Sequence, residues 1–256
     1  MRKNIVFLFA IILMSSCQIR EEMTINKNGS GEYRIGYEMG SMLKAMEGIK
    51  KDSVKNTEGK KDAEEMIEYF IPVDDIYKKA KDSLHLTKEE KKAFKEMKGM
   101  MMHIELNEKT GLMKFEYIFP YKKINQLNHF FQNLNLINNV EKRYKGKSTD
   151  KTDNLIDKFG KYKISYSFKG KVFKRKTLSS NKKPKKNEPE KENEILDKIS
   201  DYYQYRIVYH FPYPIKQIKS EGEAKMSADR KTLYINVPLV EMEKNPQLLD
   251  FEVILE

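Results

Sequence analysis

The sequence is poor in cysteine, since Cys17 is the only one among its 256 residues. A single cysteine can form no internal disulfide, so the folded chain must be held together by its hydrophobic core. Long apolar runs are lacking too: the run from Ile5 to Met14 falls short of the about 20 residues that a membrane-spanning helix needs. A transmembrane anchor is therefore the weaker interpretation of the N-terminus.

Signatures of catalysis and of metal binding are also absent. The sequence has no Gly-x-Ser-x-Gly elbow, no P-loop and no Gly-x-Gly-x-x-Gly motif. Its histidines are scattered, without the close spacing that a zinc site requires; they are His85, His103, His129 and His210. The paired carboxylates lie beside lysines, as on a solvated surface; they are Glu64-Glu65, Asp74-Asp75 and Glu89-Glu90. The sequence therefore predicts a protein that is not an enzyme and that uses no metal or cofactor.

The charge is strongly positive, with 49 lysine and arginine residues against 38 aspartate and glutamate residues and a net charge of +11. Such a balance favours anionic partners such as lipopolysaccharide, phospholipid head groups or acidic glycans. Nucleic acid is the other common partner of a basic protein, but the N-terminal leader argues against it. Charges of both signs are interspersed along the chain, so a solvated surface accounts for most of them.

The first residues have the order of a secretory signal peptide. Arg2 and Lys3 precede the apolar run, and Ser15, Ser16 and Cys17 follow it. We therefore predict a signal peptide over residues 1–16.

The segment from Leu13 to Cys17, Leu-Met-Ser-Ser-Cys, resembles the lipobox of bacterial lipoproteins. The resemblance implies that the Cys17 thiol receives a diacylglycerol, that the leader is cut before it, and that its amine is acylated with chains such as palmitate. Several acyl chains hold a protein on a membrane durably. The alternative is an ordinary secreted protein whose leader contains a cysteine.

The residues after Cys17 refine this expectation. The cysteine is followed by Gln-Ile-Arg-Glu-Glu, which has no aspartate beside the cysteine, the usual inner-membrane retention signal of enteric lipoproteins. The pair Glu21-Glu22 is similar to the acidic signal that sends Bacteroidota lipoproteins to the cell surface, although Ile19 and Arg20 intervene. We expect an outer-membrane lipoprotein that faces the periplasm or the cell surface.

Alternating apolar and polar residues, bounded by turn residues, predict β-hairpins along the chain. The expected strands of the first three hairpins are 23–27 with 32–38, 102–106 with 113–119, and 162–168 with 172–176. The longest strand is expected at 203–211, with Tyr203, Tyr205, Ile207, Tyr209 and Phe211 on one face. Further strands are expected at 224–227, 232–237 and 249–255.

Helices are predicted between these hairpins. Thr87 and Glu90 fit a capping box that opens a helix to about Lys98. Apolar residues at helical spacing predict further helices at 39–49, 124–134, 194–201 and 239–244. Together with the hairpins, they predict an α+β fold of mostly antiparallel β-hairpins with amphipathic helices packed on the sheet. Residues 17–256 are expected to form a single domain with flexible insertions near 50–62 and 179–193, and a division into two domains remains an alternative.

Methionines and tyrosines are the candidate ligand-binding residues. Flexible thioethers suit a pocket for variable apolar ligands, and tyrosine-rich strand faces suit a lipid or glycan groove. The candidates are Met97, Met100, Met101, Met102, Tyr205 and Tyr209. Ordinary core packing is the alternative interpretation of every one of them.

Two segments, from Met23 to Gly40 and from Phe211 to Leu239, resemble the opening and a later strand-turn-strand passage of LppM-like bacterial lipoproteins. The resemblance implies an antiparallel, β-rich domain at the envelope surface with lipid as a candidate ligand, and it transfers no catalytic residue. The chain is thus expected to be a membrane-anchored, non-enzymatic binding or assembly module for a lipid, a glycan or an envelope protein. The alternative is an envelope hydrolase whose active site the sequence does not reveal.

Overall fold

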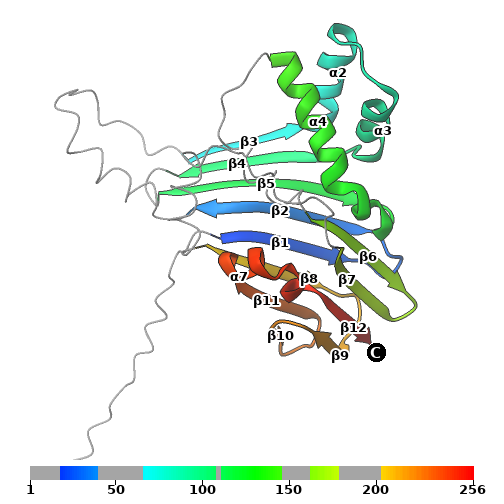
Figure 1. The fold of residues 1–256 in the computed structure, drawn as a ribbon, viewed down its shortest axis with the longest axis vertical. Helices are drawn as coiled ribbons and strands as arrows, with labels where there is room; N and C mark the ends of the chain where they lie inside the picture. Colours follow the sequence, from blue (N-terminus) through cyan, green and yellow to red (C-terminus); the bar gives the residue numbers. More distant parts are fainter. Residues whose placement is uncertain (1–17, 40–65, 108–110, 146–161, 179–202) are drawn as a thin grey trace, which may run out of the picture.

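A computed structural model describes residues 18–39, 66–107, 111–145, 162–178 and 203–256 (Figure 1). The predicted leader, Cys17, the predicted insertions near 50–62 and 179–193, and the predicted helix at 194–201 lie outside these residues. Met39 ends a strand, and the rest of the helix predicted at 39–49 also lies outside them.

The strands form two sheets. The larger has eight strands in the order β10-β11-β8-β1-β2-β5-β4-β3, and the smaller has four in the order β6-β7-β12-β9. The strands of the larger sheet are β1 (Gln18–Ile25), β2 (Gly31–Met39), β3 (Met66–Pro72), β4 (Met101–Asn107), β5 (Leu112–Tyr121), β8 (Gln204–His210), β10 (Ala224–Met226) and β11 (Thr232–Pro238). Those of the smaller sheet are β6 (Lys163–Lys169), β7 (Val172–Leu178), β9 (Ile215–Ser220) and β12 (Phe251–Leu255).

Neighbouring strands are antiparallel except for β1 and β8, which are parallel. The prediction of a mixed fold with mostly antiparallel sheets is confirmed. The three predicted hairpins correspond to β1–β2, β4–β5 and β6–β7, and the predicted pairing of 224–227 with 232–237 corresponds to β10–β11.

One strand prediction was wrong, and two strands were not predicted. The longest strand is β5, with ten residues, whereas β8 has seven and ends before Phe211, because Pro212 and Pro214 follow. The strands β3 and β9 were not predicted, because their sequences, MIEYFIP and IKQIKS, do not alternate between apolar and polar residues.

The helices are α2 (Val73–Ser83), α3 (Lys88–Glu96), α4 (Phe130–Lys145) and α7 (Leu239–Lys244), with the 3-10 helices η1 (Ile124–His129) and η2 (Pro246–Leu249). The capping box is confirmed: the Glu90 amide donates to the Thr87 hydroxyl, and the Thr87 amide donates to the Glu90 carboxylate. The predicted helix at 124–134 begins as η1 and continues as α4, and α2 was not predicted. In the described chain, no helix has the length and hydropathy needed to cross a membrane.

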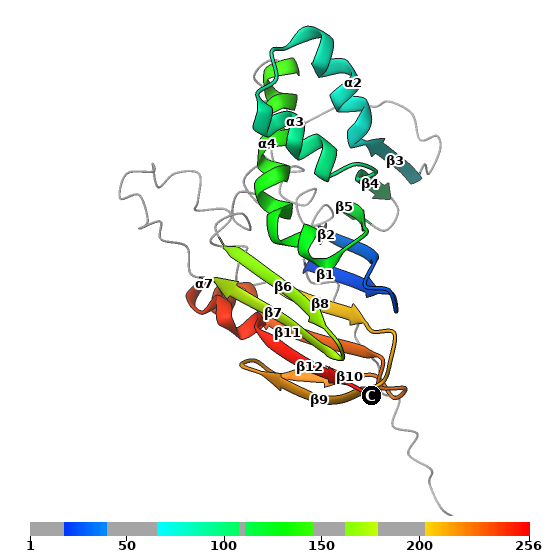
Figure 2. The same cartoon turned by 90° about the vertical axis from the view of Figure 1, so that its right-hand side faces the viewer.

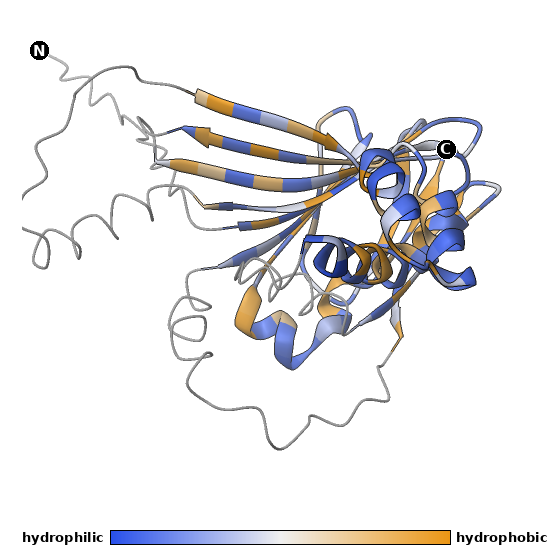
Figure 3. Cartoon of the chain, turned by 90° about the horizontal axis from the view of Figure 1, so that it is seen from above, coloured by the Kyte–Doolittle hydropathy of each residue, from blue (hydrophilic) through white to orange (hydrophobic). Residues whose placement is uncertain are grey.

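Side chains of both sheets meet in the core. Central strands of the larger sheet, such as β1 and β2, alternate between buried and more exposed residues, and the alternation of hydrophobic and hydrophilic residues along the sheet is visible in Figure 3. On β8 and its flanks, the predicted face from Tyr203 to Phe211 is buried, while Arg206 on the opposite face is exposed. Phe173 of β7 and Phe251 of β12 contact Tyr209 of β8, with ring centroids 5.7 and 5.4 Å apart. The smaller sheet therefore lies against the β8 side of the larger sheet, while α2, α3 and α4 gather at its β3–β5 side (Figure 2).

Candidate functional site

A buried polar cluster joins the two sheets around Glu21 of β1. The Arg175 guanidinium of β7 donates to both Glu21 carboxylate oxygens, over 3.2 and 3.0 Å. The Tyr166 hydroxyl donates to the same carboxylate over 2.8 Å, and the hydroxyls of Tyr205 and Tyr209 also donate to it. The Glu21 and Arg175 side chains are 0 % and 1 % exposed, so bulk water reaches neither charge.

The surroundings fix the protonation of this cluster. Burial by itself would raise the pKa of Glu21, but the Arg175 charge and the tyrosine hydroxyls outweigh it and lower that pKa below its ordinary value. Burial raises the pKa of Tyr205 and of Tyr209 well above the ordinary value, and the Glu21 charge adds to this rise. The carboxylate is therefore ionised and the phenols are neutral near pH 7, an arrangement that holds protons in place.

The sequence contains a signal for this cluster. Glu21 takes the place of an apolar residue in the alternating series Ile19, Glu21, Met23 and Ile25, and Arg175 follows Phe173 at the same spacing. A charge at a core position needs an opposite charge from another strand. Glu21 is also part of the predicted sorting signal Glu21-Glu22, which remains an expectation; in the fold the Glu21 side chain is fully buried.

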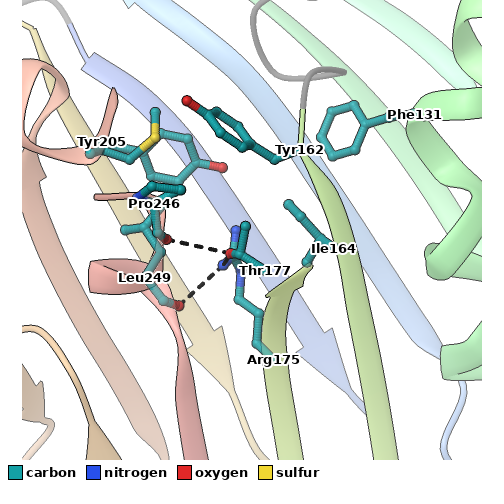
Figure 4. Close-up of a pocket in the computed structure, with 9 residues that line it drawn as sticks. Phe131, Tyr162, Ile164, Arg175, Thr177, Tyr205, Pro246 and Leu249 are labelled. Carbon is teal, nitrogen blue, oxygen red and sulfur yellow. Dashed lines mark hydrogen bonds between the residues drawn. The ribbon is translucent and has the colours of Figure 1, made fainter. Parts of the chain in front are cut away.

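A small apolar pocket adjoins the cluster, because Arg175 and Tyr205 belong to both (Figure 4). It is lined by Phe131, Tyr162, Ile164, Arg175, Thr177, Tyr205, Met242, Pro246 and Leu249. The space in which the centre of a water molecule can lie is about 10 Å³, which is room for a single water. The pocket that the described residues form is too small for a lipid or a sugar.

A larger polar groove opens where β12 begins between β7 and β9. Its volume is about 540 Å³, and its walls carry Lys176 and Lys219 together with Glu221, Asp250 and Glu252. Several of these charges are already used: Asp250 accepts from the Thr177 amide over 2.7 Å, and Glu252 pairs with Lys219 over 3.1 Å. The remaining charges are of both signs, so the groove presents no single-sign surface for a charged ligand.

The candidate methionines do not line either of these spaces. Met97 and Met100 are fully buried in the core, and Met101 and Met102 of β4 are half-buried. The candidate tyrosines lie in the polar cluster, so the fold does not bring the two groups together. Their assignment as ligand-binding residues stays a prediction.

A second polar cluster lies on the opposite face of the larger sheet, around His103 of β4. Its Nδ1 lies 2.8 Å from the Glu116 carboxylate, its Nε2 lies 2.9 Å from that of Glu68, and its ring stacks on Phe70 at 4.3 Å. Lys114 also contacts Glu116, over 2.8 Å. Within the described part of the chain, the His103 ring thus contacts two carboxylates and an aromatic ring. Among the described residues, no group of histidines, cysteines and carboxylates is placed to hold a metal ion.

The most distinctive surface is the edge strand β3. Met66, Tyr69, Phe70 and Ile71 are 57 %, 55 %, 51 % and 37 % exposed, and they form half of the large exposed hydrophobic residues of the described chain. They project from both faces of the strand, since residues alternate between faces. An exposed apolar edge of this kind invites another strand to pair with it.

The other three edges of the two sheets lack this character. The strand β10 is three residues long and carries Lys225, β6 carries Lys163 and Lys169, and β9 carries Lys216 and Lys219. Lysine on an edge strand opposes pairing with further strands. Of the four edges described, only β3 is without lysine.

Comparison with known proteins adds little to this geometry. No family model and no curated protein matches the chain. Among solved structures, the chain is similar to the NMR structure of the folded domain of LppM from Mycobacterium tuberculosis, at 9 % sequence identity and a TM-score of 0.36. The match covers 100 % of this chain and 95 % of the LppM domain. At this level of similarity, neither a fold nor a function is transferred to the chain.

Proposed function

We propose that the chain is a lipid-anchored envelope protein that acts as a non-enzymatic binding module and recognises a protein partner through the edge strand β3. The observation that carries this proposal is the exposure of Met66, Tyr69, Phe70 and Ile71 on an edge without lysine. Of the three partner classes considered, lipid, glycan and envelope protein, a protein strand suits such an edge best, because it can satisfy the backbone groups as well as the side chains.

The proposed anchor rests on the resemblance of the segment ending at Cys17 to a lipobox. The strand β1 begins at Gln18, the next residue in the sequence. An acylated Cys17 would therefore hold the folded body at the membrane without a spacer. Four successive antiparallel pairings, from β1 through β2, β5 and β4 to β3, make β3 parallel to β1. The strand β3 would then run away from the membrane. Its free edge would face sideways, toward other proteins of the same envelope.

Two measurements test the proposal in cells that express the full chain. The variant Cys17→Ser should lose labelling by a radiolabelled fatty acid and should leave the membrane fraction. A photoreactive phenylalanine analogue at Tyr69 should form an adduct with an envelope protein that mass spectrometry identifies. The matched control is the same analogue at Met226, which is 47 % exposed on β10 at the opposite edge of the sheet.

Adducts at position 69 and none at position 226 support the proposal. Equal adducts at both positions would mean that the β3 edge has no special role. Continued membrane labelling of the Cys17→Ser chain would remove the anchor from the proposal.

A further inference from the structure

The backbone of β3 determines how a partner strand can bind. The Val73 amide donates to the Met100 carbonyl over 2.9 Å, directly beyond the pair of Pro72 with Met101. In an antiparallel ladder, hydrogen-bonded and non-bonded pairs alternate. Ile67, Tyr69 and Ile71 therefore direct their backbone groups toward β4. Met66, Glu68 and Phe70 direct their N–H and C=O groups outward, where a partner strand can pair with them.

The charges beside this edge determine one side chain of the partner. Lys114, Glu105 and Glu68 stand side by side across β5, β4 and β3. In this row, the carboxylates Glu105 and Glu68 are neighbours, and Lys114 is the one cation. The Lys114 ammonium is shared with Glu116, a carboxylate outside the row that lies 2.8 Å from it. Like charges directly opposite each other destabilise a sheet, and opposite charges stabilise it. The Glu68 carboxylate already contacts His103 Nε2 over 2.9 Å, but its side chain is 42 % exposed. A lysine or arginine opposite Glu68 could therefore also reach it and would place a full positive charge at this end of the row.

We infer that β3 binds an extended segment of another protein by antiparallel strand addition, with a basic residue opposite Glu68 and apolar residues opposite Ile67, Tyr69, Phe70 and Ile71. This inference rests on the proposed function and adds the chemistry of the partner. The apolar positions follow from the exposed side chains of Tyr69, Phe70 and Ile71 and from the half-buried side chain of Ile67. The basic position follows from the row of Lys114, Glu105 and Glu68.

A second copy of the chain fits the edge less well. Antiparallel pairing of two β3 strands reverses the direction of one body relative to the other. Since β1 is parallel to β3, the two N-termini would then lie at opposite ends of the pair. Two copies anchored through Cys17 in one leaflet could not reach this arrangement, which favours a different protein as the partner.

The test uses the purified full chain and a fluorescent peptide of sequence Ser-Val-Phe-Val-Lys-Val-Ser, measured by fluorescence polarisation. In the inferred register, its lysine lies opposite Glu68 and its phenylalanine opposite Phe70. The N–H groups of these two peptide residues point at β3, whereas those of the valines point away. Methylating the backbone nitrogens of the phenylalanine and the lysine should weaken binding about tenfold or more, because two hydrogen bonds to the β3 backbone are lost. Methylating two valine nitrogens instead is the matched control and should change the affinity by less than about twofold.

The charge is tested by exchange. The variant Glu68→Lys should weaken binding of the lysine peptide and strengthen binding of a peptide with glutamate in its place, by about threefold each. The variant Met226→Lys places a lysine at the other edge of the sheet and should leave both affinities unchanged.

The outcomes separate this inference from the proposed function. Equal weakening by both pairs of methyl groups, or no binding of the lysine peptide, overturns strand addition with a basic residue. Cross-linking at Tyr69 in cells would in that case still support β3 as a protein-binding edge. Adducts between position 69 and a second copy of the chain would overturn the inference, because the partner would then be the same protein and not a different one.

Discussion

Removing Arg175 tests how the two sheets are joined. In the variant Arg175→Met, the Glu21 carboxylate keeps its tyrosine donors but loses the only cation that contacts it among the described residues. The Leu249 carbonyl also loses a donor, at 3.1 Å. Breaking a buried ion pair by removing one partner costs about 3–5 kcal/mol. We expect a loss of unfolding free energy in this range at pH 7.

The pH dependence of this loss follows from the protonation of Glu21. In the natural chain, the pKa of Glu21 is lowered, so its contribution to stability is present above the unfolded-state pKa and is lost as pH falls through the folded-state pKa. Without Arg175, burial raises the pKa of Glu21, so the sign reverses and stability is lost as pH rises. Holding a glutamate protonated at pH 7 costs about 3.7 kcal/mol, since pH 7 lies about 2.7 units above its ordinary pKa. The difference in unfolding free energy between the natural chain and Arg175→Met should therefore shrink to about 1 kcal/mol near pH 4.5. At that pH, the loss of the Arg175 hydrogen bonds is the main remaining cost.

The assay is urea denaturation followed by circular dichroism from pH 4.5 to 8, with the variant and the natural chain measured in parallel. The control is the double variant Glu21→Gln with Arg175→Met, which has no charge in the cluster and should show little pH dependence relative to Glu21→Gln alone. A loss below about 1 kcal/mol at pH 7 would mean that the pair does not hold the sheets together. A loss of equal size at both pH values would show that Glu21 does not take up the proton.

Three further predictions address the fold and its edge. The variant Thr87→Ala removes the capping box of α3 and should cost about 1 kcal/mol of unfolding free energy in urea titrations, whereas Ser83→Ala, which removes a solvent-exposed hydrogen bond, should cost less than about 0.5 kcal/mol. The variant Gly36→Ala should lower the melting temperature more than Gly170→Ala, because its new Cβ would lie 2.0 Å from the Phe115 carbonyl oxygen, while Gly170 has open space and bears only the strain of φ +59°. The variant Tyr69→Lys, at an exposed side chain, should leave the unfolding free energy within about 0.5 kcal/mol, so a loss of partner binding in this variant reports the edge and not the fold.

Local patterns in the sequence predicted much of the fold. The alternation from Tyr203 to Phe211, broken by the buried Val208, identified the buried aromatic face of β8, because side chains on one face of a strand repeat every two residues. Thr87 and Glu90 identified the start of α3, because a capping box acts within a single turn. Both signals are complete within a few neighbouring residues, which is why they can be recognised without the fold.

The remaining features depend on contacts between distant residues. The parallel pairing of β1 with β8 joins Gln18 to Gln204, and no local pattern specifies that partner. The salt bridge between Glu21 and Arg175 joins residues 154 positions apart. The strand β3 escaped prediction for another reason: it is exposed on both faces, so the requirement for alternation does not apply to it.

The proposed anchor site, Cys17, directly precedes the strand β1 in the sequence, and β1 carries Glu21 of the polar cluster. Under the proposed function, the cluster therefore has a mechanical role. A pull on an acylated Cys17 would act along β1, which has β2 on one side and β8 on the other, so it would have to shear two ladders at once. Glu21 adds a third attachment, because Arg175 ties the same strand to the smaller sheet through a buried ion pair. The edge strand β3 lies four strands away from β1, where binding would not disturb these attachments. Under the proposed function, a module that is held through a central strand and binds at an edge strand could bind a partner without loosening its own anchor.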